Sequence, residues 1–180
     1  MEFSTTDKWD EALWQKVRKI YLKEFEEGKP ENIIKNMFSK GICFLHVLME
    51  GQDTIAMALT GRVHGRPIML IDYLAVRRDL QGKGIGLIFF EKIKDWALSR
   101  NFEMMLLEAE CEQTPDNLAR IRFWKKCKFE LLEDYTHHYI WVPEPYKAMW
   151  QPLKPDAVPL TEGREAFRYI TAFHRKSFRT

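Results

Sequence analysis

The 180-residue chain has few cysteines and little net charge, and each shortage excludes some classes of protein. Its three cysteines, Cys43, Cys111 and Cys127, are an odd number without CxxC spacing, so the sequence predicts neither a disulfide framework nor a structural zinc site. We expect all three thiols to be reduced and structural. Lys and Arg number 28 against 26 Asp and Glu, and the resulting charge of +2 disfavours a dedicated nucleic-acid-binding protein.

Long apolar runs are also missing. No stretch reaches the roughly 18 residues that indicate a membrane-spanning helix. The first residues lack the basic and apolar regions of a signal peptide. The sequence therefore predicts a soluble, cytoplasmic protein without a membrane partner. With 46% hydrophobic and 30% charged residues, the composition is that of one compact domain over residues 1–180 rather than of a disordered chain.

Hydrophobic periodicity divides the chain into helical and strand-like segments. Apolar spacings of three and four predict helices over residues 7–28, 30–39, 86–101, 118–126 and 161–179. Strand-like runs cover residues 42–49, 54–63, 68–76, 104–110 and 129–142, with a short one over 146–150. The first three strands form an antiparallel meander, and the fourth lies beside the third. The predicted fold class is therefore mixed α/β, with a core over about 42–142 and a proline-rich segment and helix over 143–180.

The most informative segment runs from a strand end into a helix through three glycines, Gly82, Gly84 and Gly86. Such a turn directs free backbone N–H groups and the positive end of a helix dipole to one place, which is how proteins hold a pyrophosphate. We therefore expect an anionic cofactor. The P-loop pattern fails, because Lys83 stands between glycines and no hydroxyl residue follows it. The dinucleotide pattern GxGxxG is weak, because its third glycine is replaced by a larger residue.

Two motifs resemble the GNAT superfamily of N-acetyltransferases. The acetyl-CoA motif of that family, [QR]-x-x-G-x-[GA] at a strand-to-helix turn, is matched by Gln81, Gly84 and Gly86. The later stretch from Asn117 to Phe129 is similar to the family's N-x-x-A-x-x-F-Y-x-x-x-G-F helix. The resemblance covers residues 42–142. It implies a GNAT-like fold, acetyl-CoA as co-substrate, and transfer of an acetyl group to a primary amine.

The resemblance also assigns cofactor-binding positions. It implies that the strand end splays from its neighbour and leaves backbone groups free for the pantetheine arm. The N–H of Val76 would then stabilise the oxyanion at the thioester carbonyl. The glycine turn, with Lys83 nearby, would hold the pyrophosphate, and Asn117 would contact CoA from the later helix. The expected cofactor-binding residues are Leu74, Ala75, Val76, Gln81, Gly82, Lys83, Gly84, Ile85, Gly86, Asn117 and Trp124.

Acetyl transfer to an amine needs a base, because an alkylammonium of pKa about 10 must lose a proton before it attacks. Asp72 is the first candidate, since strand alternation places it on one face with Leu70, Leu74 and Val76. Glu108 and Glu110 share a face of the adjacent strand and are the second candidates. The alternatives are a salt bridge from Asp72 to an arginine and a solvated strand end for the two glutamates. Acids that line one cleft would favour a cationic acceptor.

The sequence departs from the family pattern where many members carry a tyrosine that protonates the leaving thiolate. Trp124 stands at that position, and an indole N–H is far too weak an acid for the role. Tyr139, Tyr73 and Tyr135 are the candidate substitutes. Alternatively, the thiolate leaves unassisted, since a thiol of pKa about 8.5 is a tolerable leaving group near neutral pH. The departure keeps open a second class of function, a CoA-binding module without catalysis.

Other features carry less specific chemistry. His137 and His138 occupy adjacent strand positions and point to opposite faces, so we predict no metal site. Nothing marks Cys111 or Cys127 as a low-pKa thiolate, which favours direct transfer over an acyl-enzyme. The basic tail from Phe173 to Arg179 is interpreted as a solvated helix end rather than as a nucleic-acid contact.

The acceptor and the assembly are the least constrained by the sequence. We expect a small cationic amine, with a protein amine group, an O-acetylated acceptor or a longer acyl donor as alternatives. This preference rests on analogy at the level of the fold. The family resemblance also implies a homodimer, with the proline-rich segment and the last helix as candidate contacts.

Overall fold

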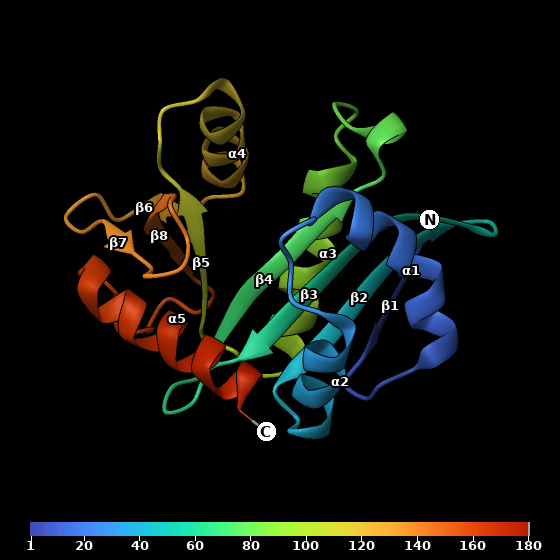
Figure 1. Ribbon diagram of the computed structural model, residues 1–180, viewed down its shortest axis with the longest axis horizontal. Helices are drawn as coiled ribbons and strands as arrows, with labels where there is room; N and C mark the ends of the chain where they lie inside the picture. The colour runs from blue at the N-terminus through green and yellow to red at the C-terminus, as the bar shows by residue number, and fades with distance from the viewer. Residues whose placement is uncertain (180) are drawn as a thin grey trace.

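The structure is a computed structural model that describes residues 1–179 (Figure 1). Within that range an eight-stranded sheet has the order β1-β2-β3-β4-β5-β8-β6, and β7 pairs with β8. The strands are β1 (Glu2–Thr6), β2 (Cys43–Glu50), β3 (Asp53–Arg62), β4 (Ile68–Val76), β5 (Met104–Glu110), β6 (Glu130–Leu131), β7 (His137–His138) and β8 (Pro145–Pro152). The helices are α1 (Glu11–Glu24), α2 (Glu31–Ser39), α3 (Ile85–Ser99), α4 (Pro115–Lys126) and α5 (Gly163–Phe178), with a 3-10 turn over Arg78–Leu80.

The antiparallel meander predicted from the sequence is confirmed. β2, β3 and β4 pair antiparallel in chain order, and β5 returns parallel to β4. A parallel return needs a crossover connection, and α3 provides it. The mixed α/β fold class is therefore confirmed as well.

Helices cover both faces of the sheet and enclose two apolar clusters (Figure 1). α1, α2 and α5 pack on one face over a cluster that includes Trp14, Ile34 and Phe167. α3 and α4 pack on the other face over a cluster that includes Phe90 and Ile121. We call these the α1/α5 face and the α3/α4 face. The face on which a strand residue lies decides which helices its side chain meets.

The parallel contact between β4 and β5 is short. Within the described chain the register joins only Ile68, Met69 and Leu70 to Met104, Met105 and Leu106. Beyond this contact the two strands diverge toward their carboxyl ends, as Figure 1 shows. Residues 71–76 of β4 therefore have one edge paired with β3 and one edge without a strand partner. We call the second edge the open edge of β4.

A β-bulge in β4 changes which face its side chains reach. The register with β3 skips Asp72, so Asp72 is the extra residue of the bulge. Asp72 and Tyr73 both lie on the α1/α5 face, whereas Leu74 and Val76 pack in the cluster on the α3/α4 face. The prediction that Asp72 shares a face with Leu70, Leu74 and Val76 holds for Leu70 and is wrong for Leu74 and Val76, because the bulge shifts the alternation by one residue.

The prediction of one long strand over residues 129–142 is also wrong. Only β6 and β7 pair within it, with two residues each. The place beside β5 is taken by β8, which is longer than the sequence indicates. Asp134 turns out of the segment and accepts the N–H of Gly163 at the start of α5 over 3.0 Å. Asp134 thus anchors the start of α5, at a position where the sequence predicted a continuous strand.

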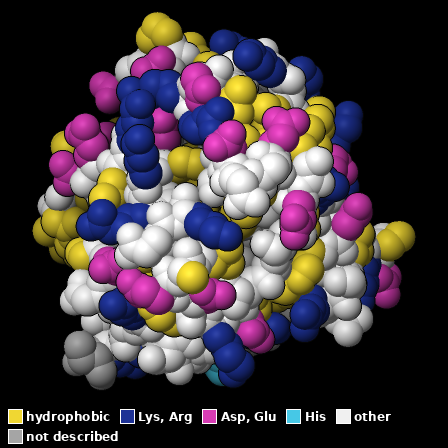
Figure 2. All heavy atoms as spheres, turned by 90° about the vertical axis from the view of Figure 1, so that its right-hand side faces the viewer, with side chains coloured by type: hydrophobic (Ala, Val, Ile, Leu, Met, Phe, Trp, Pro, Cys, Tyr) yellow, Lys and Arg dark blue, Asp and Glu magenta, His cyan; other side chains and the backbone are white. Residues whose placement is uncertain are grey.

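None of the helices in residues 1–179 combines the length and the apolar composition of a membrane span. On the surface shown in Figure 2, Lys, Arg, Asp and Glu side chains are intermixed with small hydrophobic areas. This face of the molecule therefore presents both signs of charge to solvent.

Candidate functional site

The glycine turn between β4 and α3 has the backbone geometry of an anion site. Gly82 and Gly84 have φ angles of +78° and +83°, a region that glycine adopts without strain. A Cβ built on either residue would meet no atom within 4 Å, so both border open space. α3 begins at Ile85, directly after Gly84, and its positive dipole end therefore lies at this turn.

The backbone donors of the turn are unpaired. Within the described chain, the N–H groups of residues 82–87 donate to no backbone carbonyl. Unpaired N–H groups at the start of a helix are the donors that bind phosphate oxygens. Lys83 is exposed beside them and adds a positive charge. Free donors, open space and positive potential together fit a pyrophosphate group.

Two residues of the motif hold this turn in place. Nε2 of Gln81 donates to the carbonyl oxygen of Val76 over 3.0 Å, which ties the turn to the end of β4. Gly86 lies where α3 approaches α4, and a Cβ there would stand 3.0 Å from Cε1 of Phe123. The glycine therefore allows the two helices to approach each other.

The open edge of β4 adds free backbone groups beside the turn. The N–H of Arg77 donates to Ile55 on β3 over 2.8 Å. Successive N–H groups of an extended strand point to opposite sides. The N–H groups of Leu74 and Val76 therefore point away from β3 and toward the diverging β5. A ligand in extended conformation could bind this edge as a further strand would.

Asp72 is buried in an ion pair. Its Oδ2 lies 2.7 Å from Nζ of Lys29, and the two side chains are 5% and 4% exposed. The backbone of Lys29 is fixed as well, since its N–H donates to Oη of Tyr73 and its carbonyl accepts from Oη of Tyr21. The partner of Asp72 is thus a lysine of the α1–α2 loop and not one of the arginines considered from the sequence. The negative charge of Asp72 is therefore compensated by Lys29 inside the protein.

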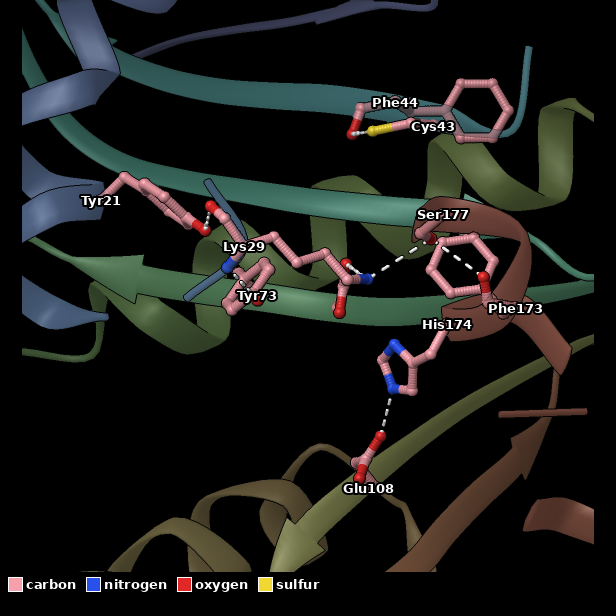
Figure 3. A network of polar contacts seen from close by, with 10 residues as sticks. Tyr21, Lys29, Cys43, Phe44, Tyr73, Glu108, Phe173, His174 and Ser177 are labelled. Atoms are coloured by element: carbon pink, nitrogen blue, oxygen red, sulfur yellow. Dashed lines mark hydrogen bonds and ion pairs between the residues drawn. The ribbon is translucent and has the colours of Figure 1, made fainter. Parts of the chain in front are cut away.

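Glu108 lies between donors from two other segments, and Figure 3 shows its contact with one of them, His174. Oη of Tyr139 donates to its Oε1 over 2.8 Å, and Nε2 of His174 lies 2.6 Å from its Oε2. The side chains of Glu108 and His174 are 16% and 24% exposed. Burial, together with the charge of Glu108, raises the pKa of Tyr139, so its hydroxyl stays protonated and acts as a donor. We call Glu108, Tyr139 and His174 the Glu108 cluster.

His174 is the functional candidate that the sequence analysis misses. It lies in the basic tail interpreted as a solvated helix end, but α5 packs across the sheet and carries it to Glu108. A signal was present: His174 follows Phe167 and Ile170 at spacings of seven and four. Those spacings put it on the side of α5 that faces the sheet.

The other predicted residues have different neighbours. Glu110 is partly exposed, and its Oε2 lies 4.0 Å from Nη1 of Arg120. Asn117 is buried and uses its side chain within the protein: Nδ2 donates to the carbonyl of Glu112, and Oδ1 accepts from Arg120. Trp124 packs edge-on against aromatic rings of the α3/α4 face. Asn117 thus orders the loop before α4, and contact of Asn117 or Trp124 with a cofactor stays a prediction.

The thiols are not activated. Cys43, Cys111 and Cys127 are free, and burial raises the pKa of each, that of Cys127 to about 12. A thiolate nucleophile is therefore disfavoured. In the described part of the chain, no group of three or more His, Cys, Asp or Glu side chains is placed to hold a metal ion.

Comparisons with known proteins point to one family. A family model described as the acetyltransferase (GNAT) family matches residues 11–129, which is more than half of the chain. No curated protein is significantly similar in sequence.

Solved structures share the fold at low sequence identity. A Bacteroides thetaiotaomicron protein assigned to the GNAT family has a TM-score of 0.76 and 14% identity, over 99% of this chain and 100% of its own. An aminoglycoside 6'-N-acetyltransferase complexed with coenzyme A has a TM-score of 0.69 and 12% identity, over 88% and 100%. The ribosomal-protein-S18-alanine N-acetyltransferase from Escherichia coli has a TM-score of 0.58 and 16% identity, over 88% and 99%. At such identities the similarity establishes the fold.

Proposed function

The chain belongs to the GNAT family of acetyltransferases, and on that premise we propose that it transfers the acetyl group of acetyl-CoA to a primary amine of a small cationic acceptor. The observation that carries the proposal is the glycine turn beside the open edge of β4. Unpaired N–H groups of residues 82–87 lie next to those of Leu74 and Val76. The donors of the glycine turn suit a pyrophosphate, and those of the open edge suit an extended arm such as pantetheine.

In this proposal the glycine turn holds the pyrophosphate. The N–H groups of Gly82, Lys83, Gly84, Ile85 and Gly86 are the donors, and Gln81 fixes the turn to β4. The residues from Leu74 through Ala75 to Val76 bind the pantetheine arm along the open edge. The N–H of Val76 stabilises negative charge at the thioester carbonyl. Bound there, acetyl-CoA supplies the activated acetyl group.

The acceptor would bind on the α1/α5 face. Glu108 projects to this face, and Glu110, two residues on, shares it by alternation. The rings of Tyr139 and Tyr146 lie edge to face with their centroids 5.6 Å apart. Carboxylates and aromatic faces together attract ammonium groups. Because Lys29 already compensates Asp72, Glu108 and Glu110 are the acids that attract the acceptor.

Binding of acetyl-CoA tests the proposal. The unchanged protein should show a higher melting temperature with acetyl-CoA or CoA but not with NAD, because a ligand that binds only the folded state stabilises it. Gly84→Glu should lose the shift, since a carboxylate would repel the pyrophosphate. Gly51→Glu is the matched control: Gly51 also has a positive φ, +61°, and an open Cβ position, but it lies in the β2–β3 turn. No shift in the unchanged protein, or an equal shift in Gly84→Glu, would contradict the proposal.

An amine panel then separates catalysis from binding. The similar structures include an aminoglycoside and a protein acetyltransferase, so the panel should hold polyamines, aminoglycosides and amino-terminal peptides. Release of the CoA thiol measures turnover. Turnover with small cationic amines is the expected result. Binding of acetyl-CoA without thiol release for any amine would favour the second candidate, a CoA-binding module without catalysis, which Trp124 at the tyrosine position first suggested.

A further inference from the structure

Glu108 and His174 form a pair with the geometry of an oriented base. A carboxylate has only acceptor atoms, so the 2.6 Å contact requires the hydrogen of the neutral imidazole to lie on Nε2 of His174. Tyr139 donates to the other carboxylate oxygen, which prevents the carboxylate from turning away. With Nε2 protonated, Nδ1 carries the free lone pair.

Nδ1 faces the region between the diverging strands. Figure 3 shows the ring of His174 between β4 and β5, with one nitrogen on Glu108 and the other directed toward β4. Within the described chain, His174 makes no hydrogen bond through Nδ1. The open edge of β4, on which the acetyl group is proposed to lie, borders the same diverging pair of strands. The ring nitrogen of His174 that is free of hydrogen bonds in the described chain is therefore directed toward β4, whose open edge is the proposed position of the acetyl group.

The part of α5 that carries His174 is held by contacts with β3 and with Lys29. Phe173 packs against Gly61 of β3, where a Cβ would overlap its ring. Nζ of Lys29 lies 4.9 Å from the centroid of the same ring and 3.5 Å from Oγ of Ser177. Phe173, directly before His174, and Ser177, three residues after it, thus contact β3 and the buried ion pair. A base held this way is oriented before the substrate arrives.

We propose that His174 is the catalytic base and that Glu108 positions it, an inference that rests on the function proposed above. Nδ1 of His174 takes one proton from the acceptor ammonium, and Glu108 stabilises the imidazolium that results. The amine lone pair then forms the bond to the acetyl carbon while the carbon–sulfur bond breaks and its electron pair leaves on sulfur. The second proton lost by the nitrogen neutralises the sulfur, and His174 returns the first proton to water.

Two of the three acids expected from the sequence, Asp72 and Glu108, are less suited to accept this proton. Oδ2 of Asp72 is occupied by Lys29, and its side chain is 5% exposed. Both oxygens of Glu108 accept hydrogen bonds from Tyr139 and His174. Nδ1 of His174 is a basic nitrogen that makes no hydrogen bond within the described chain.

Turnover of single variants gives the first test. His174→Gln should lower kcat for the best amine of the panel by about 100-fold or more, the usual contribution of a positioned base, without changing the melting shift caused by acetyl-CoA. His138→Gln, an exposed histidine in β7, is the matched control and should keep full activity. Normal kcat in His174→Gln would overturn this inference alone. Failure of the unchanged protein to bind acetyl-CoA would instead overturn the proposed function, and this inference with it.

Two further readouts distinguish a base from a packing residue. In His174→Ala, added imidazole should restore part of kcat, which a merely structural histidine would not allow. Long-range ¹H–¹⁵N NMR of the unliganded protein should place the hydrogen of His174 on Nε2, and Glu108→Leu, which leaves Nε2 without an acceptor at this position, should abolish this preference. A hydrogen on Nδ1 in the unchanged protein, or no response to imidazole, would contradict the proposal. The double variant of both residues should be no slower than the His174 variant alone, because the two act as a unit.

Discussion

Lys29 and Asp72 place opposite charges in the interior, 2.7 Å apart. Desolvation of both charges offsets most of their attraction, but removal of one leaves the other buried without a partner. Lys29→Met should therefore lower the free energy of unfolding by about 3 to 5 kcal/mol. Urea unfolding at pH 7 measures the change, and addition of Asp72→Asn to the variant should restore part of the loss.

An exposed pair provides the control for this experiment. Arg18 and Glu31 lie 3.9 Å apart with side chains 49% and 39% exposed. Arg18→Met should change the free energy of unfolding by about 1 kcal/mol at most, as is usual for surface pairs. If Lys29→Met costs no more than Arg18→Met, the interior pair does not hold β4 to the α1–α2 loop.

His46 is a second buried titratable residue, enclosed between β1 and β3. Its Nδ1 and Nε2 lie 2.8 Å from Oγ1 of Thr5 and of Thr60, and burial lowers its pKa from 6.5 to about 3. Between those two values the unfolded chain binds a proton that the folded chain does not. The free energy of unfolding should therefore fall as the pH falls below 6.5, by up to about 1.4 kcal/mol per pH unit.

Urea unfolding at two pH values tests this linkage. The unchanged protein should be less stable at pH 5.5 than at pH 7, and His46→Gln should reduce that difference. His64→Gln, at an exposed position in the β3–β4 turn, should leave the difference unchanged. The same pH dependence in all three proteins would show that His46 is not the group responsible.

Among the elements, those with a strong pattern of their own were predictable. The meander and β5 alternate or run apolar, and α3 starts directly after a glycine turn. β1 has one large apolar residue, Phe3, and is a strand only because it pairs with β2. β8 likewise owes its extent to β5. Where a partner strand determines the structure, local propensity cannot reveal it.

The seating of α5 depends on one glycine of β3. A Cβ at Gly61 would overlap the ring of Phe173, so Gly61→Ala should displace α5. The free energy of unfolding should fall by about 1 to 3 kcal/mol, the usual cost of overpacking. His174 follows Phe173 directly, so kcat should fall too.

A compensating change checks the cause. Gly61→Ala combined with Phe173→Leu should recover stability relative to Gly61→Ala, because the smaller side chain makes room for the new Cβ. Limited proteolysis should cut α5 faster in Gly61→Ala than in the unchanged protein. Equal cleavage rates and equal stability would mean that this contact does not seat the helix.

The whole molecule has a sheet that opens between β4 and β5, with α5 in contact with elements on both sides, namely α2, β5 and β8. The proposed cofactor side of the candidate site was predictable, because the glycine turn is contiguous in sequence. The proposed acceptor side was not predictable, because Glu108 and His174 are 66 residues apart and only the packing of α5 brings them together. The motif therefore revealed the cofactor side, and the acceptor side required the fold.

Amide exchange can detect the open edge in solution. The N–H groups of Leu74 and Val76 should exchange faster than those of Ala75 and Arg77, which point to β3. Acetyl-CoA should slow exchange at Leu74 and Val76 specifically, because its arm would supply acceptors there. Uniform protection along β4 without ligand would contradict an unpaired edge.

The bulge in β4 also bears on how such a chain can diverge over generations. Asp72 is the extra residue of the bulge. Without it, the side chains of β4 would alternate regularly between the two faces of the sheet. An additional buried charge in a strand is tolerated only where an opposite charge pairs with it. Here Lys29, in a separate loop, is that partner of Asp72. In related sequences, we expect the acid and the lysine to be gained and lost together, as one heritable unit.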